Sequence, residues 1–376
     1  MKSLSPHAPA ALAPEDLQRF LTHGSIYASG TNSFFLAWDA SRDPSGSPGL
    51  SNLRFFCPEF FAAAAPDNES VPKGQAIVDR LTLQEALQSY LTASPKIPVV
   101  SWEAATRDVF SQQFSALKGL IDRGEILKGV PYSQIRASAT VSPSWIAARL
   151  HAALRKESAT YLYGTWSEAE GIIGCTPERL CYYEQDTQVV TTEVVAGTKT
   201  LESYHYGALL NDPKAIREHT LVIEDLSERL SEFGSVEIGT TDECQVPGLV
   251  HLKTPLRVLV RRASISLRDV VQRLHPTAAL GVYPRNSAGR AWLQEADRQL
   301  PRWRFGAPFG VSFSRDPENS RVNAGFSCLV AIRNVQWRGK LLCINAGCGV
   351  IESSQLEWEW QECLAKIQSI RNLLDL

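Results

Sequence analysis

The order of strand-like and helix-like segments limits the folds open to this chain most strongly. Strand-like segments follow one another in hairpin pairs, at 160–166 and 170–175 and again at 179–185 and 188–195, before the next helical segment begins. Strands joined by short turns pair antiparallel, whereas a parallel sheet needs a crossover after each strand. The order therefore predicts an α+β fold, with large antiparallel β-sheets and helices packed around a buried site.

Hydrophobic periodicity and end signals place the other elements. Helices are predicted at 15–22, 82–92, 102–124, 142–155, 212–234, 267–274 and 287–299, and from near Ser354 onward. Further strands are predicted at 25–39, 50–57, 235–240, 248–266, 322–336 and 340–346, with a Ser/Pro/Gly-rich loop at 41–51. No segment has the composition of a linker, so we expect a single domain over residues 1–376.

Composition and charge exclude several classes of function. The 376 residues are 44% hydrophobic, which is ample for a large core, and the formal net charge is only -2. The sequence has no basic stripe, so we expect no binding to nucleic acid or to an anionic membrane. No apolar run reaches the roughly 20 residues of a membrane span. The eight cysteines form no Cys-x-x-Cys pair, and prolines interrupt the N-terminal stretch, so we predict a cytoplasmic protein.

The segment after the last predicted strand presents charged side chains in helical register. Glu359, Glu362 and Lys366 are spaced by three and four residues, which puts them on one face of a helix. A glycine-broken strand end at 346–349 precedes this helix, and bare backbone there could approach a ligand closely. The alternative is a solvated helix face with ordinary salt-bridge spacing.

Three earlier charged residues lie at the ends of predicted elements. Lys128 begins a strand or lies just before one, Glu178 follows a proline at a junction between strands, and Glu218 lies in the early turns of the helix capped by Asp212. The residues alone favour a surface lysine at a strand end as the explanation of Lys128. Glu178 is equally explained by a surface salt bridge with Arg179.

Six motifs occur in one order along the chain. They are Gly174-Cys-Thr-Pro-Glu-Arg-Leu180, Ala196-Gly-Thr198, Asp212-Pro-Lys-x-x-x-Glu218-His219, His275-Pro-Thr-Ala-Ala-Leu280, Ala331-Ile-Arg333 and Ala346-Gly-Cys-Gly349. In this order they resemble the chorismate-utilising enzymes, over about residues 115–376. The resemblance implies a fold of antiparallel sheets and helices around a buried site, and it implies magnesium dependence. Residues 1–100 would then be a divergent N-terminal part of the same domain, and 115–376 the motif-bearing catalytic part.

The resemblance also implies the ligands of the metal and the roles of two catalytic residues. Glu218 and Glu362 correspond to magnesium ligands, with Glu359 beside the metal, and Mg²⁺ prefers such oxygen ligands. Converging carboxylates repel one another unless a cation lies between them. Lys128 resembles the base that activates water at ring C2 of chorismate, and Glu178 the acid that protonates the leaving C4 hydroxyl. Burial favours a neutral lysine and a protonated glutamate, as these roles require.

Further residues correspond to substrate contacts. Thr198 and the amides near the glycines could bind substrate carboxylates, and Arg333 could hold one with two hydrogen bonds. The alternative for the glycines is a set of plain turns and bulges. His251 resembles a histidine near the ring hydroxyl, although a lone histidine in a strand is often structural. The predicted substrate-binding set is Gly197, Thr198, His251, Ala279, Leu280, Arg333, Gly347, Gly349 and Lys366.

Two positions distinguish the branches of this family. Aminodeoxychorismate synthases carry a lysine where this chain has Ala196, which disfavours that branch. Anthranilate synthases usually carry glutamine where Lys128 stands, because ammonia attacks there instead of water. The resemblance therefore favours isochorismate synthase, with salicylate synthase as the alternative and a non-catalytic chorismate-binding relative as a third reading. Chorismate is the expected partner, without an obligatory glutamine amidotransferase subunit, and the pattern fits menaquinone and siderophore pathways alike.

The sequence departs from the family pattern at three positions. Pro131 interrupts the strand after Lys128 and cannot donate a ladder hydrogen bond, so we expect a local change of register. Ala215 stands where an acidic residue near the metal is common, which predicts weaker or more hydrated magnesium binding. Asn345 replaces a usually larger side chain beside the ring, which predicts an altered fit to the substrate.

Overall fold

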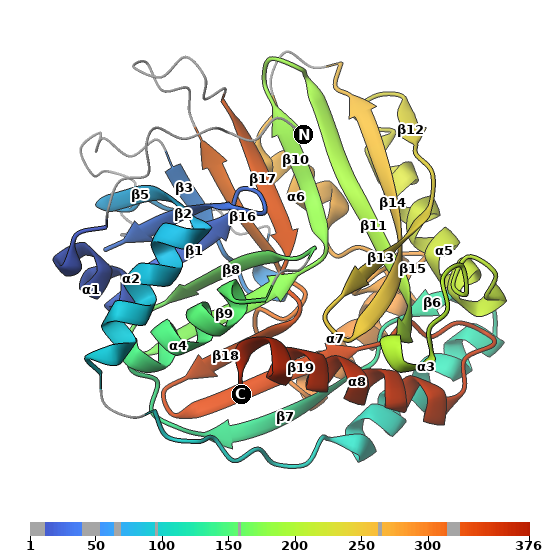
Figure 1. Cartoon of the computed structure of the whole chain (residues 1–376). Helices are drawn as coiled ribbons and strands as arrows, with labels where there is room; N and C mark the ends of the chain where they lie inside the picture. Colours follow the sequence, from blue (N-terminus) through green and yellow to red (C-terminus); the bar gives the residue numbers. More distant parts are fainter. Residues whose placement is uncertain are drawn as a thin grey trace.

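Two large antiparallel sheets form the centre of the molecule (Figure 1). The computed structural model describes residues 12–39, 53–63, 69–94, 97–156, 159–261, 265–313 and 324–376. The predicted α+β class is confirmed, because the strand pairs in both sheets run antiparallel and helices cover the sheets. The loop predicted at 41–51 lies outside the described residues.

The first sheet combines strands from both ends of the chain. Its eight described strands follow the spatial order β5-β2-β1-β8-β9-β18-β19-β7. Their bounds are Gly74–Asp79 (β5), Ser33–Trp38 (β2), Gly24–Ala28 (β1), Tyr161–Trp166 (β8), Glu170–Thr176 (β9), Asn334–Arg338 (β18), Leu341–Gly347 (β19) and Tyr132–Ser138 (β7). Helices α1 (Pro14–Thr22), α2 (Arg80–Thr92), α4 (Pro143–Leu154) and α8 (Leu356–Leu374) pack on one face, over a cluster of buried apolar residues from strands and helices.

The second sheet follows the order β12-β14-β11-β10-β17-β16-β3-β4, with β13 paired to β14. The bounds are Val236–Ile238 (β12), Leu249–Leu259 (β14), Val189–Thr200 (β11), Arg179–Glu184 (β10), Gly325–Val330 (β17), Pro308–Phe313 (β16), Leu53–Phe56 (β3), Glu69–Ser70 (β4) and Asp242–Val246 (β13). Helices α3 (Arg107–Asp122), α5 (Pro213–Leu230), α6 (Leu267–Leu274) and α7 (Ser287–Gln299) form the largest core cluster with this sheet. Short 3₁₀ turns lie at Phe60–Ala62 and Leu201–Ser203.

The two sheets pack against each other through aromatic and aliphatic side chains. Tyr27 and Tyr163 of the first sheet both contact Phe309 of the second, with ring centroids 6.3 and 5.0 Å apart. These side chains belong to one buried cluster drawn from both sheets. Burial of this apolar surface fixes the sheets relative to each other, so residues at neighbouring strand ends are held close together.

The strand predicted at 25–39 is wrong, because the chain turns back within it. β1 and β2 pair antiparallel as a hairpin, with Ala28 opposite Phe34. The amide of Ser29 donates to the carbonyl of Ser33 at 3.0 Å, which closes the turn. The intervening Gly30-Thr-Asn32 has turn-forming residues that outweigh the apolar pattern on both sides.

The strand predicted at 322–336 is also wrong, because its described part belongs to two sheets. β17 ends at Val330 in the second sheet and β18 begins at Asn334 in the first. Arg333 has a φ of 56°, a left-handed conformation that breaks the extended chain. The side-chain amide of Asn334 donates to Ala331 O at 2.7 Å and holds this corner. The crossing places Arg333 between the sheets.

The other predicted elements lie near their predicted positions, whereas β4, β5, β13, β15 (Val282–Tyr283) and β16 were not predicted. β14 ends at Leu259 instead of 266, and α3 begins at Arg107 rather than 102. The interruption expected at Pro131 is present: β6 (Lys128–Gly129) pairs with β15, and β7 starts only at Tyr132. No helix within the described ranges is long and apolar enough to cross a membrane. The division into an N-terminal and a catalytic part stays a prediction.

Candidate active site

A pocket lies where β11, β14, α5, α8 and the crossing between β17 and β18 come together. The structure brings all but three of the predicted site residues to its wall: Glu178, Gly197, Thr198, Glu218, His251, Ala279, Leu280, Arg333, Gly347, Gly349 and Lys366. Lys128, Glu359 and Glu362 lie behind this wall in contact with residues of the site. Segments separated by more than two hundred residues therefore meet in one place.

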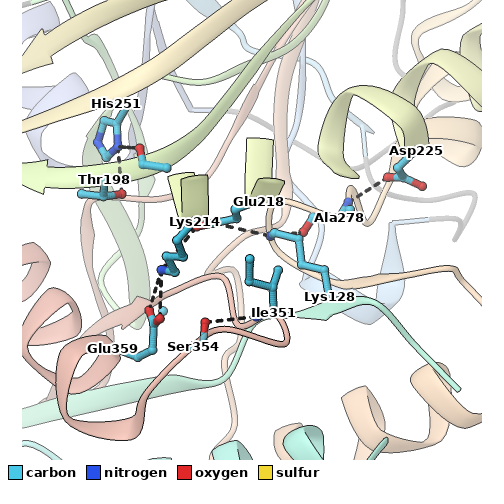
Figure 2. A network of polar contacts seen from close by, with 12 residues as sticks. Lys128, Thr198, Lys214, Glu218, Asp225, His251, Ala278, Ile351, Ser354 and Glu359 are labelled. Carbon is cyan, nitrogen blue, oxygen red and sulfur yellow. Dashed lines mark hydrogen bonds and ion pairs between the residues drawn. The ribbon is translucent and has the colours of Figure 1, made fainter. Parts of the chain in front are cut away.

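Lys128 is fully buried at the start of β6. Its ammonium nitrogen donates to the carbonyl of Ala278 at 2.6 Å and lies 3.8 Å from Oε1 of Glu218 (Figure 2). Burial lowers the pKa of Lys128, and the charge of Glu218 partly opposes this effect. A lysine with a lowered pKa is more often in the neutral form, which can accept a proton, than a lysine in water.

Glu178 connects β9 and β10 and is buried, as its predicted position at a strand junction allows. Burial raises its pKa to about 8, although Lys128 and Lys366 act in the opposite direction. The carboxyl group is therefore protonated at neutral pH and able to donate a proton. The surface salt bridge with Arg179 that the sequence left open is excluded by this burial and by the stacking of Arg179 on Tyr161.

A histidine and an arginine share a hydrogen bond at the opposite side of the pocket. The guanidinium of Arg333 donates to Nε2 of His251 at 2.9 Å, so this ring nitrogen accepts. Nδ1 must then carry the hydrogen, which it can give to the carbonyl of Gly197 at 3.2 Å. Burial and the charge of Arg333 hold the pKa of His251 well below its usual range. His251 is thus a neutral ring in one tautomer, set by its neighbours.

Arg333 keeps one donor for a ligand. Its Nη1 is buried and has no hydrogen-bond partner among the described residues. Thr198 lies beside it, with its hydroxyl 3.1 Å from Nδ1 of His251. Because a buried guanidinium donor without a partner costs free energy, this corner fits a carboxylate of a bound molecule.

Lys366 lies on the C-terminal helix, one turn after Glu362. It donates to Glu362 Oε1 at 2.6 Å and to the carbonyl of Gly347 at 2.8 Å. Burial opposes ionisation of Glu362, but the charges of Lys366 and Lys214 outweigh it and lower the pKa of Glu362 to about 2. The predicted face of charged residues on this helix is therefore turned inward, not toward solvent.

Three carboxylates converge beside the pocket. Glu218 comes from α5, and Glu359 and Glu362 come from α8. Oε2 of Glu218 is buried without a hydrogen bond to any described residue, and Gly349 leaves space for this side chain, since a Cβ there would lie 1.9 Å from Glu218 Oε1. In their chemistry, these partly unsatisfied oxygen donors suit a hard cation such as Mg²⁺. In the observed arrangement, Lys214 lies among them instead.

Lys214 is the site residue that the sequence reasoning missed. It lies one turn before Glu218 and forms ion pairs with all three carboxylates. Figure 2 labels Lys214 together with Glu218 and Glu359. Within the described ranges, no three acidic, histidine or cysteine side chains stand close enough to hold a metal by themselves. The motif Asp212-Pro-Lys-x-x-x-Glu218 contained the signal, because its lysine and glutamate have helical i,i+4 spacing.

A second missed group holds the loop beneath Lys128. Asp225 is fully buried and accepts two hydrogen bonds from Arg285, each 2.7 Å long. Its carboxylate also accepts from the amide of Ala278 at 2.8 Å, and the carbonyl of the same residue receives Lys128. Asp225 and Arg285 therefore position the main-chain group that Lys128 contacts.

Two of the residues that depart from the family pattern, Ala215 and Asn345, lie at or beside the pocket. Ala215 is buried beneath Gly197, whose absent Cβ would lie 3.1 Å from the Ala215 Cβ. Asn345 lines the pocket, and its Oδ1 accepts from Gln134, whose own Oε1 accepts from Arg136. This relay fixes the orientation of the amide, and Nδ2 of Asn345 has no hydrogen-bond partner among the described residues.

Comparison with known proteins finds relatives named as isochorismate synthases and relatives named as anthranilate synthases. Its sequence is 29% identical over 230 residues to the isochorismate synthase MenF of Bacillus subtilis, which covers 59% of this chain and 46% of the relative. It is 33% identical over 212 residues to the salicylate biosynthesis isochorismate synthase of Pseudomonas aeruginosa, covering 54% and 41%. These matches span about half the length of the curated relatives.

Solved structures share the fold. MenF of Escherichia coli, described as a menaquinone-specific isochorismate synthase, matches with a TM-score of 0.72 at 18% identity, over 99% of this chain and 97% of that one. Anthranilate synthase component I of Streptococcus pneumoniae matches with a TM-score of 0.66 at 15% identity, over 93% and 92%. The sequence also matches the family described as chorismate binding enzyme over residues 63–375. The chain therefore belongs to the chorismate binding enzyme family.

Proposed function

We propose that this chain is a magnesium-dependent isochorismate synthase, which converts chorismate to isochorismate. The observation that carries the proposal is the pairing of buried Lys128 with buried Glu178 at one pocket, the first with a lowered and the second with a raised pKa. Opposite shifts of two such groups are typical of an acid and a base acting in the same reaction. The names of several sequence relatives agree with this activity.

The reaction adds water at ring C2 and releases the C4 hydroxyl. Neutral Lys128 takes a proton as the oxygen of water bonds to C2, and both ring double bonds shift as the C4–O bond breaks. Protonated Glu178 gives its proton to the departing oxygen, which leaves as water. The two groups end the turnover in the opposite protonation states, which is the arrangement that the reverse reaction needs.

Neighbouring residues would bind the two carboxylates of chorismate. The unpaired Nη1 of Arg333, with Thr198 and neutral His251, fits one carboxylate. Glu218, Glu359 and Glu362 would hold magnesium, which would supply positive charge for a second substrate carboxylate. Gly347 and Gly349 keep this side of the pocket open, because a Cβ at either would collide with a neighbour at 2.9 Å or less.

Lys128 also favours water over ammonia as the nucleophile, as the sequence pattern predicted. A lysine that activates water makes an ammonia supply unnecessary, so we expect no obligatory glutamine amidotransferase subunit. Salicylate synthase is the alternative, since it forms isochorismate and then eliminates pyruvate. The two differ in the final product and are separated by the experiment below.

The test is the product formed from chorismate by the full chain with magnesium, separated by chromatography with and without EDTA. We expect isochorismate in equilibrium with chorismate, and loss of the product when EDTA is present. Salicylate with pyruvate would replace the proposal by its alternative. Bound chorismate without any product would overturn the enzymatic function.

A further inference from the structure

Lys214 occupies the point on which the three carboxylates converge. Its Nζ lies 2.9 Å from Oε1 and 3.1 Å from Oε2 of Glu359, 3.6 Å from Oε2 of Glu218 and 4.0 Å from Oε2 of Glu362. Lys214 and Glu359 are 145 residues apart in the sequence, so their contact does not follow from helical spacing. The contact is therefore created by the packing of α5 near α8.

In Glu218 and in Glu362, the two carboxylate oxygens face different lysines. Oε1 of Glu218 faces Lys128 at 3.8 Å, while its Oε2 faces Lys214. Oε1 of Glu362 pairs with Lys366 at 2.6 Å, while its Oε2 faces Lys214. The oxygens turned toward Lys214 are thus those without another cation, and they are the oxygens that a divalent cation would need.

Two cations cannot share this point. A divalent ion bound to these oxygens at normal distances of about 2.0–2.1 Å would meet the lysine ammonium within a few ångströms, at a strong Coulomb penalty. The Lys214 side chain is 28% exposed, whereas those of Glu218 and Glu359 are 6% and 2% exposed. Lys214 is therefore the most exposed of the four side chains, ahead of Glu362 at 14%.

We propose that Lys214 is a built-in counter-ion of the cation site: it neutralises the three carboxylates in the metal-free protein and is displaced when magnesium binds. This inference rests on the proposed magnesium-dependent function. It assigns a physical role to a residue outside the predicted acid, base and metal ligands. Removing the lysine leaves the carboxylates without their shared cation, so magnesium should bind more tightly and the metal-free protein should be less stable.

The test is magnesium titration by calorimetry on the full chain, comparing wild type with Lys214→Met. The matched control is Lys199→Met, which removes one positive charge nearby but from a lysine that pairs with Asp212 at 2.9 Å and not with the cluster. We expect the dissociation constant to fall at least about tenfold in Lys214→Met and to change less than about twofold in the control. Magnesium should also raise the melting temperature of Lys214→Met more than that of wild type.

A third variant separates failure of this inference from failure of the proposed function. Glu218→Gln should abolish the binding heat if it arises at this site. Absence of any such heat in wild type would overturn magnesium binding itself, and with it the inference. Wild-type binding that Lys214→Met leaves unchanged or weakens would overturn the counter-ion role alone.

If Lys214→Met fails to fold without metal, circular dichroism during magnesium titration replaces calorimetry. Folding restored at or below the wild-type dissociation constant supports the counter-ion role, and folding that magnesium does not restore contradicts it.

Discussion

The polar network of the site has two ends, with Lys128 between them (Figure 2). At one end, Asp225 has both carboxylate oxygens hydrogen-bonded to Arg285 or to Ala278, all within 2.8 Å. At the other end, Oε2 of Glu218 has no hydrogen bond among the described residues, and the nearest cation is Lys214 at 3.6 Å. Buried polar groups with complete partners are rigid, whereas incompletely paired ones favour rearrangement or ligand binding.

Because of this difference, one part of the site can hold side chains in fixed positions while the other part has carboxylate oxygens open to a ligand. The Asp225 end holds the loop at Ala278, and through it the ammonium of Lys128. At the carboxylate end, we expect one cation to replace another while that loop stays in place. The predictions below test the two ends and the pocket between them.

The largest expected effect is that of replacing Glu178, the proposed acid in the pocket wall. Glu178→Gln should lower kcat/KM for chorismate by about 10²–10⁴-fold, because the amide cannot donate the proton that the leaving hydroxyl needs. Steady-state kinetics with a circular dichroism check of folding would measure it. Glu193→Gln is the matched control, since Glu193 pairs with Lys253 and is absent from the pocket wall. An activity loss of the same size in both variants would contradict the role of Glu178.

Removing the carboxylate of the rigid end should mainly affect stability. Asp225→Ala leaves Arg285 and the amide of Ala278 without their buried partner, which should lower the free energy of unfolding by about 3–5 kcal/mol. Urea denaturation would measure this change. Glu228→Ala, on the same helix but exposed, should lower it by less than about 0.5 kcal/mol. Equal losses of unfolding free energy in the two variants would contradict a stabilising role of Asp225.

The pH profile tests the protonation state of Glu178. Its raised pKa of about 8 means that the protonated, active form predominates below this pH and is lost above it. At pH values where Lys128 is already neutral, we expect kcat/KM to fall as pH rises through about 8, approaching tenfold per pH unit. Rates measured between about pH 6 and about pH 10, with folding verified at each pH, would show this alkaline limb. A profile that stays flat across the range would contradict an acid with this pKa.

The smallest expected effect concerns the pocket wall at Asn345. Asn345→Ala removes the unpaired amide donor that faces the pocket, so KM for chorismate should rise by a few-fold, corresponding to about 1 kcal/mol, with kcat little changed. Gln134→Ala, which frees the amide to rotate without altering the wall, should have a weaker effect of the same sign. An unchanged KM in Asn345→Ala would mean that the amide makes no contact with substrate.

Local patterns in the sequence determined much of the fold. Helix ends marked by capping residues were placed closely: Asp212 caps α5 by accepting from the amide of Ala215 at 2.9 Å, as its position before Pro213 predicted. Hairpin strands were also placed well, because alternation and turns are local signals. The prediction of one strand at 322–336 failed because Arg333 adopts a left-handed conformation, and arginine is not a residue type that indicates such a conformation in a sequence.

The sequence by itself identified most of the charged side chains of the candidate site, since they stand in motifs at element ends, but it did not identify Lys214 or Asp225. Only the tertiary structure decided how they pair. Lys214 reaches Glu359 across 145 residues, and Asp225 reaches Ala278 through a loop that no local pattern connects to it. Ion pairs and hydrogen bonds act over a few ångströms, so they depend on how helices and sheets pack, which local sequence patterns do not specify.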